Sequence, residues 1–180
     1  MPSHSDFLGY YDEYKHKVFS FLLYRVGGDR MLAEDLTSDV FLKAYQRFET
    51  YNTAYAFSTW IYTIARNTCI DHIRKHKQLA DLEDAEEVPD DIAETALSQA
   101  VDTELGMTEV YDHLLQLPGF QRECIILKYL NGLSTSEIAE ATNQSEENVR
   151  QALSRGIRKL RTLMTILTLF LQLLIHPFLA

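Results

Sequence analysis

The sequence is poor in cysteine, and the two cysteines that it has are badly placed for a disulfide or a cysteine metal site. Among 180 residues, Cys69 and Cys124 are the only ones. They lie far apart in sequence, within helical patterns, and they form no C-x-x-C spacing. We therefore expect two buried thiols in a protein of the reducing cytosol.

Motifs of catalysis are also missing. The sequence has no nucleotide-hydrolysing loop, no catalytic triad and no cluster of metal ligands. His72 and His76 have the i, i+4 spacing of two metal ligands, but no nearby cysteine or acidic cluster completes such a site. We expect no enzyme, no cofactor and no metal, with both histidines solvated.

Basic residues are absent from one long segment. Residues 1–80 carry 10 basic and 9 acidic side chains, residues 81–112 carry none and 12, and residues 113–180 carry 7 and 5. The net charge of -9 therefore belongs to the middle segment, and the flanking parts remain suited to an anionic ligand. Pro89, within the acidic run, and few large apolar residues predict an acidic flexible linker over residues 79–106.

Strand-like alternation is absent as well, and the periodicity on both sides of the linker is helical. This predicts an all-α protein with two small helical domains, residues 1–78 and 107–163, and an apolar tail, residues 164–180. The first domain should hold helices at about 7–26, 29–48 and 57–77, the first ended by Gly27-Gly28 and the second capped by Asp29. The second should begin with helices at 107–116 and 119–130, broken at Leu117-Pro118 and stopped at Asn131-Gly132.

The second domain then shows the pattern of a helix-turn-helix. Ser134 and Glu137 have the S-x-x-E spacing of a capping box, Asn143 suits a left-handed turn, and Ser145 can cap a longer helix. On that helix an apolar stripe predicts a core-facing side, which comprises Val149, Leu153, Gly156, Ile157, Leu160 and Met164. The opposite side carries Gln151, Ser154, Arg155 and Arg158, with Arg150 and Arg161 at its edge.

Arginine, glutamine and serine are side chains that read base edges in a major groove, and Arg158, further along, would reach phosphates. The alternative is an ordinary solvated amphipathic helix. The capped turn upstream favours DNA.

The helix expected at 57–77 is both aromatic and basic. Its inner face should hold Phe57, Ile61, Ile64, Ala65 and Thr68, and its outer face Thr59, Tyr62, Thr63, Arg66, Asn67, Ile70, Arg74 and Lys77. Single-stranded DNA binds to aromatic surfaces because unstacked bases gain free energy there. The preceding loop, with Tyr51, Asn52 and Tyr55, suits a pocket for an extruded base, whereas core packing is favoured for Trp60.

Three segments in order resemble one family, the bacterial sigma factors of the extracytoplasmic-function type. AEDLTSDVFLKAYQRF, residues 33–48, is similar to the family's A-E-D-L-x-Q-E-x-F segment that binds core polymerase, with Ser38-Asp39 in place of Gln-Glu. FSTWIYTIARNTCIDHIRK, residues 57–75, resembles its promoter-melting helix. Residues 117–160, from LPGFQREC to LSRGIRKL, resemble its domain that reads the minus-35 element.

This resemblance implies a transcription initiation factor that binds core RNA polymerase, directs it to promoter DNA and helps to open the minus-10 element. It implies polymerase contacts by Asp35, Leu36, Asp39, Phe41 and Leu42. It implies minus-10 contacts by Tyr51, Asn52, Tyr55, Arg66, Asn67, Arg74 and Lys75, and minus-35 contacts by Arg150, Gln151, Ser154, Arg155 and Arg158.

The tail TLMTILTLFLQLLIHPFLA, residues 162–180, departs from the family's pattern because it is long and apolar. We expect it to be buried against a partner such as an anti-sigma factor, against a membrane, or against the protein itself. The expected localisation is cytoplasmic, with membrane association left open. Other functions also remain open: a membrane-associated or partner-regulated helix-turn-helix DNA-binding regulator, a membrane-tethered interaction protein whose helix-turn-helix is only a protein-binding scaffold, and a repressor that binds duplex DNA alone.

Overall fold

The computed structural model describes residues 4–80 and 113–175, with side chains described from residue 6 to 76 and from 113 to 163. Within these ranges every regular element is helical, which confirms the all-α fold class. The linker expected at 79–106 and the helix expected at 107–116 fall almost entirely outside the described residues, apart from helical residues 79–80 and 113–115.

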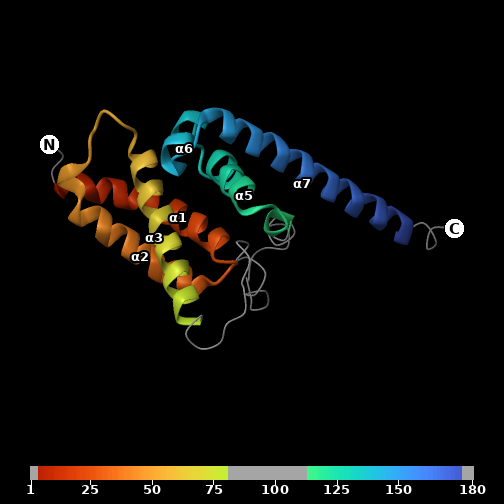
Figure 1. Cartoon of the computed structure of the whole chain (residues 1–180), viewed down its shortest axis with the longest axis horizontal. Helices are drawn as coiled ribbons and strands as arrows, with labels where there is room; N and C mark the ends of the chain where they lie inside the picture. Colours follow the sequence, from red (N-terminus) through yellow and green to blue (C-terminus); the bar gives the residue numbers. More distant parts are fainter. Residues whose placement is uncertain (1–3, 81–112, 176–180) are drawn as a thin grey trace.

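The first group of helices, the N-terminal bundle, consists of α1 (His4–Arg25), α2 (Arg30–Gln46) and α3 (Phe57–Ala80), with the 3-10 turn η1 (Phe48–Thr50) after α2. The three helices contact one another pairwise (Figure 1). Their ends confirm the predicted signals. Gly27 and Gly28 adopt positive φ after α1, and Asp29 caps α2 by accepting a hydrogen bond from the Leu32 amide at 3.0 Å.

Aromatic rings fill one end of the N-terminal bundle. Phe48 and Phe57 are buried at the centre of this cluster of rings, and Tyr10 stacks on Phe57 with ring centroids 4.0 Å apart. Tyr51 stacks on Phe48 at 6.0 Å and meets Phe57 edge-on at 5.5 Å. These pairs join α1, η1 and α3 into one core, because edge-on and stacked rings both pack favourably.

The second group, the C-terminal bundle, consists of α5 (Gly119–Ile125), the π-helical turn η2 (Ile126–Leu130), α6 (Thr135–Thr142) and α7 (Glu146–Ile175). The sequence predicts one regular helix from 119 to 130, but its last turn is π-helical, with the Asn131 amide donating to the Ile126 carbonyl at 3.1 Å. Hydrogen bonds from i to i+5 widen the turn, which periodicity in a sequence does not reveal. Gly132, at φ 77°, then ends it.

The predicted helix-turn-helix is present in the C-terminal bundle. Ser134 and Glu137 form a capping box, and Asn143 takes the left-handed conformation at φ 53°. The Asn148 amide then donates to the Ser145 hydroxyl oxygen at 3.1 Å, which caps α7. These three local signals fix the turn between α6 and α7.

Helix α7 continues to Ile175 and projects away from the rest of the chain (Figure 1). Side chains beyond residue 163 lie outside the described residues, so the predicted burial of the tail stays a prediction. No helix within the described ranges combines the length and the hydropathy that crossing a bilayer requires.

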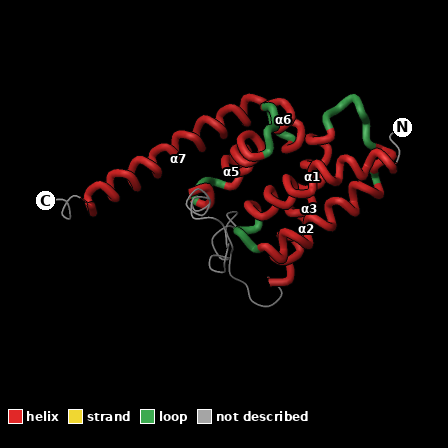
Figure 2. Tube along the Cα trace, turned by 180° about the vertical axis from the view of Figure 1, so that it is seen from behind, coloured by secondary structure: helices red, strands yellow, loops and turns green. Residues whose placement is uncertain are grey.

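The two bundles lie against each other. Helix α3 contacts α6, as views from the front and from behind agree (Figures 1 and 2). Helix α1 also contacts η2. Both cysteines are fully buried and free, Cys69 in α3 and Cys124 in α5, as predicted. Burial raises the pKa of the Cys124 thiol to about 12, so this thiol remains protonated at neutral pH.

Candidate nucleic-acid and polymerase interfaces

Helix α7 has one face in the core and one in solvent. Val149, Ala152 and Leu153 are buried against the rest of the C-terminal bundle, and Gly156 lies directly over Ile125 of α5. The residues predicted to meet the minus-35 element are all exposed, namely Arg150, Gln151, Ser154, Arg155 and Arg158. The amphipathic pattern therefore placed these side chains on the solvent side correctly.

Side chains on the exposed face of α7 are linked to one another along the helix. Arg150 pairs with Glu147 at 3.1 Å and with Glu146 at 3.5 Å, and Gln151 donates to Glu147 at 3.0 Å. Hydrogen bonds from Gln151 and Arg150 lower the pKa of Glu147, so its carboxylate is ionised at neutral pH. Exposed pairs of this kind contribute little free energy, and a DNA ligand can replace them.

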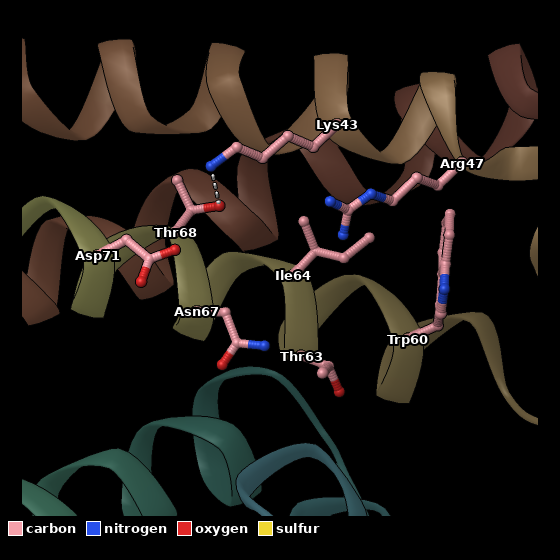
Figure 3. Close-up of a pocket in the computed structure, with 8 residues that line it drawn as sticks. All are labelled: Lys43, Arg47, Trp60, Thr63, Ile64, Asn67, Thr68 and Asp71. Atoms are coloured by element: carbon pink, nitrogen blue, oxygen red, sulfur yellow. Dashed lines mark hydrogen bonds between the residues drawn. The ribbon is translucent and has the colours of Figure 1, made fainter.

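A depression between α2 and α3 forms a second candidate site, which we call the α2–α3 pocket (Figure 3). Lys43 borders it from α2 and Arg47 from the residue that follows α2, and Trp60 and Asn67 border it from α3. Its remaining lining residues are Thr63, Ile64, Thr68 and Asp71. Lys43 is fixed by donating to the Thr68 hydroxyl at 3.0 Å.

The α2–α3 pocket combines an indole edge, an amide and two cations within one depression. An indole can stack on a base, an amide can pair with base edges, and the cations can hold phosphates. Of these residues, only Asn67 was among those that the sequence predicts for the minus-10 element. Lys43 and Arg47 stand at i, i+4, and Trp60 and Asn67 stand at i, i+7. Helical spacing of this kind places each pair on one side of the chain, and it was the signal by which the sequence could have indicated the pocket.

The loop before α3 does not present all of its predicted residues to solvent. Asn52 and Tyr55 are exposed, and the Asn52 side chain accepts from the Ala54 amide at 3.0 Å. Tyr51 is buried, and its hydroxyl donates to the Tyr55 carbonyl at 2.7 Å. In this arrangement the Tyr51 ring supports Trp60 from the core and offers no open face to a base.

The basic residues of α3 differ in their surroundings. Arg74 and Lys75 are exposed, and Arg74 lies 4.0 Å from Asp71. Arg66 is only partly exposed, with its Nε 3.2 Å from Oε1 of Glu123 in the C-terminal bundle. Thr59 and Tyr62 were also expected on the outer face of this helix, but both are buried. That expectation was wrong because the C-terminal bundle covers this side of α3.

The segment predicted to bind polymerase lies on α2. Asp35 and Asp39 are exposed, and so is Leu42 at 56%. Leu36 and Phe41 are buried in the N-terminal bundle, so they hold α2 in place and present no surface of their own to a partner. Among the predicted residues, the exposed ones are thus two carboxylates and the apolar Leu42.

Two family models match the chain, sigma-70 region 2 over residues 10–79 and sigma-70 region 4 over residues 107–160. The extracytoplasmic-function (ECF) RNA polymerase sigma factor SigW of Bacillus subtilis is 35% identical over 83% of this chain and 84% of its own length. The ECF sigma factor BldN of Streptomyces coelicolor is 32% identical over 86% of this chain, which spans 58% of that relative's length.

Solved structures show the same fold. The sigma factor RpoE from Bartonella quintana, in complex with the anti-sigma factor NepR, superposes with a TM-score of 0.75 at 22% identity, covering 89% of this chain and 98% of that one. CnrH, in complex with the cytosolic domain of CnrY, gives 0.66 at 19% identity, covering 91% and 90%. The chain therefore belongs to the sigma-70 family as a sigma factor of the extracytoplasmic-function type, a transcription initiation factor for RNA polymerase.

Proposed function

We propose that the α2–α3 pocket holds an unpaired base of the minus-10 element while the exposed face of α7 reads the minus-35 element. The chain thereby directs core RNA polymerase to a promoter and helps to open it, and the polymerase supplies the chemistry. The observation that carries this proposal is the pocket itself, which Trp60, Asn67, Lys43 and Arg47 help to line.

Opening a duplex requires a site that binds the opened form more tightly than the closed form. A stacked, paired base presents no face to a side chain, whereas an extruded base presents two. Trp60 is backed by the aromatic core and Lys43 is fixed by Thr68, so both groups are held in place before DNA arrives. Such a pocket gains its binding free energy only after the base has left the stack. Asn52 and Tyr55 of the adjacent loop, with Arg74 and Lys75, would extend the contact along the strand.

Helix α2 supplies the proposed polymerase contact through Asp35, Asp39 and Leu42. An exposed carboxylate pair next to an apolar side chain suits a basic partner surface with an apolar centre. Leu36 and Phe41 would act indirectly, because burial of these two side chains fixes the orientation of α2.

An anti-sigma factor is a further proposed partner. The structural relatives RpoE and CnrH were solved with NepR and with the cytosolic domain of CnrY, respectively. Co-purification of the tagged chain from its own host, followed by mass spectrometry, should recover a protein that blocks transcription when it is added back. Recovery of polymerase subunits alone would argue against this partner.

Transcription with purified core polymerase tests the proposed function directly. Adding the chain to core polymerase on fragmented genomic DNA should produce transcripts whose start sites share two upstream elements. A repressor would bind a duplex site without polymerase, and an interaction scaffold would show no promoter dependence. Unchanged transcription would contradict the proposal.

Fluorescence of Trp60 gives a test of the pocket. Trp60 is the only tryptophan of the sequence, so its emission reports on the pocket alone. Trp60 can be replaced by 5-hydroxytryptophan, which is excited at a wavelength where the tryptophans of the polymerase give no signal. In the complex with polymerase, a single strand carrying the minus-10 element should quench this emission. A scrambled strand is the matched control. Equal quenching by both strands would show that the pocket does not select the element.

A further inference from the structure

A buried carboxylate joins the two bundles. The Glu123 side chain on α5 is only 3% exposed. Its Oε2 lies 3.1 Å from Nη1 of Arg25 on α1, and its Oε1 lies 3.2 Å from Nε of Arg66 on α3. The Arg66 contact is a close ion pair without the alignment of a hydrogen bond. Both of these arginines belong to the N-terminal bundle, whereas Glu123 belongs to the C-terminal bundle.

Such a carboxylate is stable in a buried position only while its cations remain beside it. Removing an ionised group from water is costly, and nearby opposite charges offset that cost. Arg122, the neighbour of Glu123 on α5, donates from Nη2 to the carbonyls of Leu115 and Leu117 within its own bundle. The charge of Glu123 is therefore compensated across the contact between the bundles by Arg25 and Arg66.

Polar contacts continue along the same seam. The Ser58 hydroxyl on α3 donates to Oε1 of Glu137 on α6 at 2.9 Å, and Nδ2 of Asn131 donates to the Lys17 carbonyl at 3.2 Å. Tyr62 is 1% exposed between the bundles, and burial raises the pKa of its hydroxyl. A seam with this many polar groups can open reversibly, because each of them can be solvated once the bundles separate.

In the closed arrangement, residues that the resemblance assigns to the minus-10 element lie against the C-terminal bundle. In the structure the two bundles touch, and Arg66, which the resemblance assigns to the minus-10 backbone, is occupied by Glu123. Asn67 and Thr63 also point toward the C-terminal bundle, as Figure 3 shows.

We propose that Glu123, Arg25 and Arg66 form an intramolecular clasp that holds the free protein closed, and that binding to promoter and polymerase requires its release. The clasp withholds Arg66, which the resemblance assigns to the minus-10 backbone, and holds the two bundles against each other. This inference rests on the proposed function only for the consequence of opening. The closed state itself is a property of the chain alone.

Neutralising Glu123 tests the clasp without altering a proposed DNA contact. Glu123→Gln keeps the shape of the side chain and removes the charge that both arginines face. Glu140→Gln is the matched control, because it makes the same change at an exposed position of the same bundle. Arg25→Gln removes the clasp from the other side. Small-angle X-ray scattering on the free proteins should show a larger radius of gyration for Glu123→Gln and Arg25→Gln, and no change for Glu140→Gln.

A second measurement follows the consequence of opening. The apparent affinity for DNA is proportional to the fraction of molecules that are open. Because Glu123→Gln should increase this fraction, it should bind a minus-10 single strand at least about threefold more tightly than the wild type. Glu140→Gln should change this affinity by less than about twofold, which measures the general effect of removing one negative charge.

A locked variant covers the case in which a substitution disturbs folding. Ser58→Cys with Glu137→Cys, joined by a short cleavable thiol crosslinker, should hold the bundles together and abolish promoter-directed transcription until the crosslink is cleaved. Circular dichroism confirms helix content in every variant. An unchanged radius of gyration in folded Glu123→Gln, or full activity of the crosslinked protein, would overturn the clasp. Failure of the uncrosslinked chain to support any transcription would instead count against the proposed function.

Discussion

The indole of Trp60 packs on the ring of Tyr51, with centroids 5.1 Å apart and ring planes at 35°. Tyr51 is buried and is held by its hydroxyl bond to the Tyr55 carbonyl, so Trp60 has a rigid support on its core side. The other side of Trp60 borders the α2–α3 pocket beside Arg47. The aromatic core thus positions the one tryptophan of the chain for a ligand.

Asn67→Ala should impair promoter opening while leaving the protein folded. Asn67 is exposed, so its removal leaves no buried group without a partner, and the melting temperature should remain within about 2 °C of the wild type. If its amide binds an extruded base, the substitution should make open-complex formation less favourable by about 1 to 3 kcal/mol. This corresponds to a decrease of about fivefold to more than a hundredfold in the equilibrium constant of opening. Permanganate footprinting measures the opened bases. A template already mismatched at the minus-10 element should restore most of the transcription, and a defect of equal size on both templates would contradict the role in opening.

Arg155→Ala and Arg158→Ala should differ in kind. Loss of a base-reading arginine should cost about 1 to 3 kcal/mol of binding free energy and relax sequence preference at one position. Loss of a phosphate contact should weaken binding to all sequences alike and reduce the salt slope by about 1. We expect the first behaviour from Arg155 and the second from Arg158, since both are exposed on α7 but Arg158 lies one turn nearer the C-terminus. Fluorescence anisotropy of holoenzyme on intact and mutated minus-35 elements, at several salt concentrations, separates them. Identical salt slopes and identical sequence preferences would show that the assignment is wrong.

Ser134→Ala should weaken the start of α6. The Ser134 hydroxyl accepts from the Glu137 amide at 3.2 Å, and losing such a cap costs about 1 kcal/mol. Ser136→Ala is the control, because this serine lies on the same helix, is exposed and does not cap it. Urea unfolding should place the midpoint of Ser134→Ala below that of Ser136→Ala, and equal midpoints would show that the cap contributes nothing.

The ionised Glu137 should stabilise the fold only above acidic pH. Burial by itself would raise the pKa of Glu137, but hydrogen bonds from Ser134 and Ser58 outweigh it and hold the pKa below its ordinary value of 4.5. A carboxyl whose pKa is lower in the folded state stabilises that state fully above its unfolded value, and this stabilisation is lost as the pH falls through the folded value. The difference in unfolding free energy between wild type and Glu137→Gln should therefore be constant from about pH 7 to 6 and shrink below about pH 4.5. A difference that does not change with pH would show that the charge is irrelevant.

Two glycine substitutions should have opposite effects on stability. A Cβ on Gly9 in α1 would meet no atom within 4 Å, whereas a Cβ on Gly156 in α7 would lie 2.6 Å from Cδ1 of buried Ile125. Replacing a helical glycine by alanine gains about 0.5 to 1 kcal/mol, but overpacking a core costs about 1 to 3. Gly9→Ala should raise the melting temperature and Gly156→Ala should lower it. A rise in both would show that Ile125 moves aside at no cost.

Local signals explain why much of the fold could be predicted. Asp29, Ser134 and Ser145 each satisfy amides within the next three residues, and Asn143 tolerates a left-handed turn, so these ends depend only on neighbouring sequence. The apolar stripe of α7 likewise put its polar residues in solvent. The π-helical turn at Ile126–Leu130 was missed because it changes hydrogen-bond register without changing composition.

The sequence by itself determined where α2, α6 and α7 begin, where α1 and α6 end, and which predicted residues of α7 face solvent, because caps and periodicity act over a few neighbouring residues. Only the tertiary structure decided that Tyr51 supports Trp60 from the core, that Lys43 and Arg47 complete a pocket with Asn67, and that Glu123 faces Arg25 and Arg66. Periodicity reports that a helix has a buried side, but a second covered side, such as that of Tyr62 on α3, depends on which distant surface packs there.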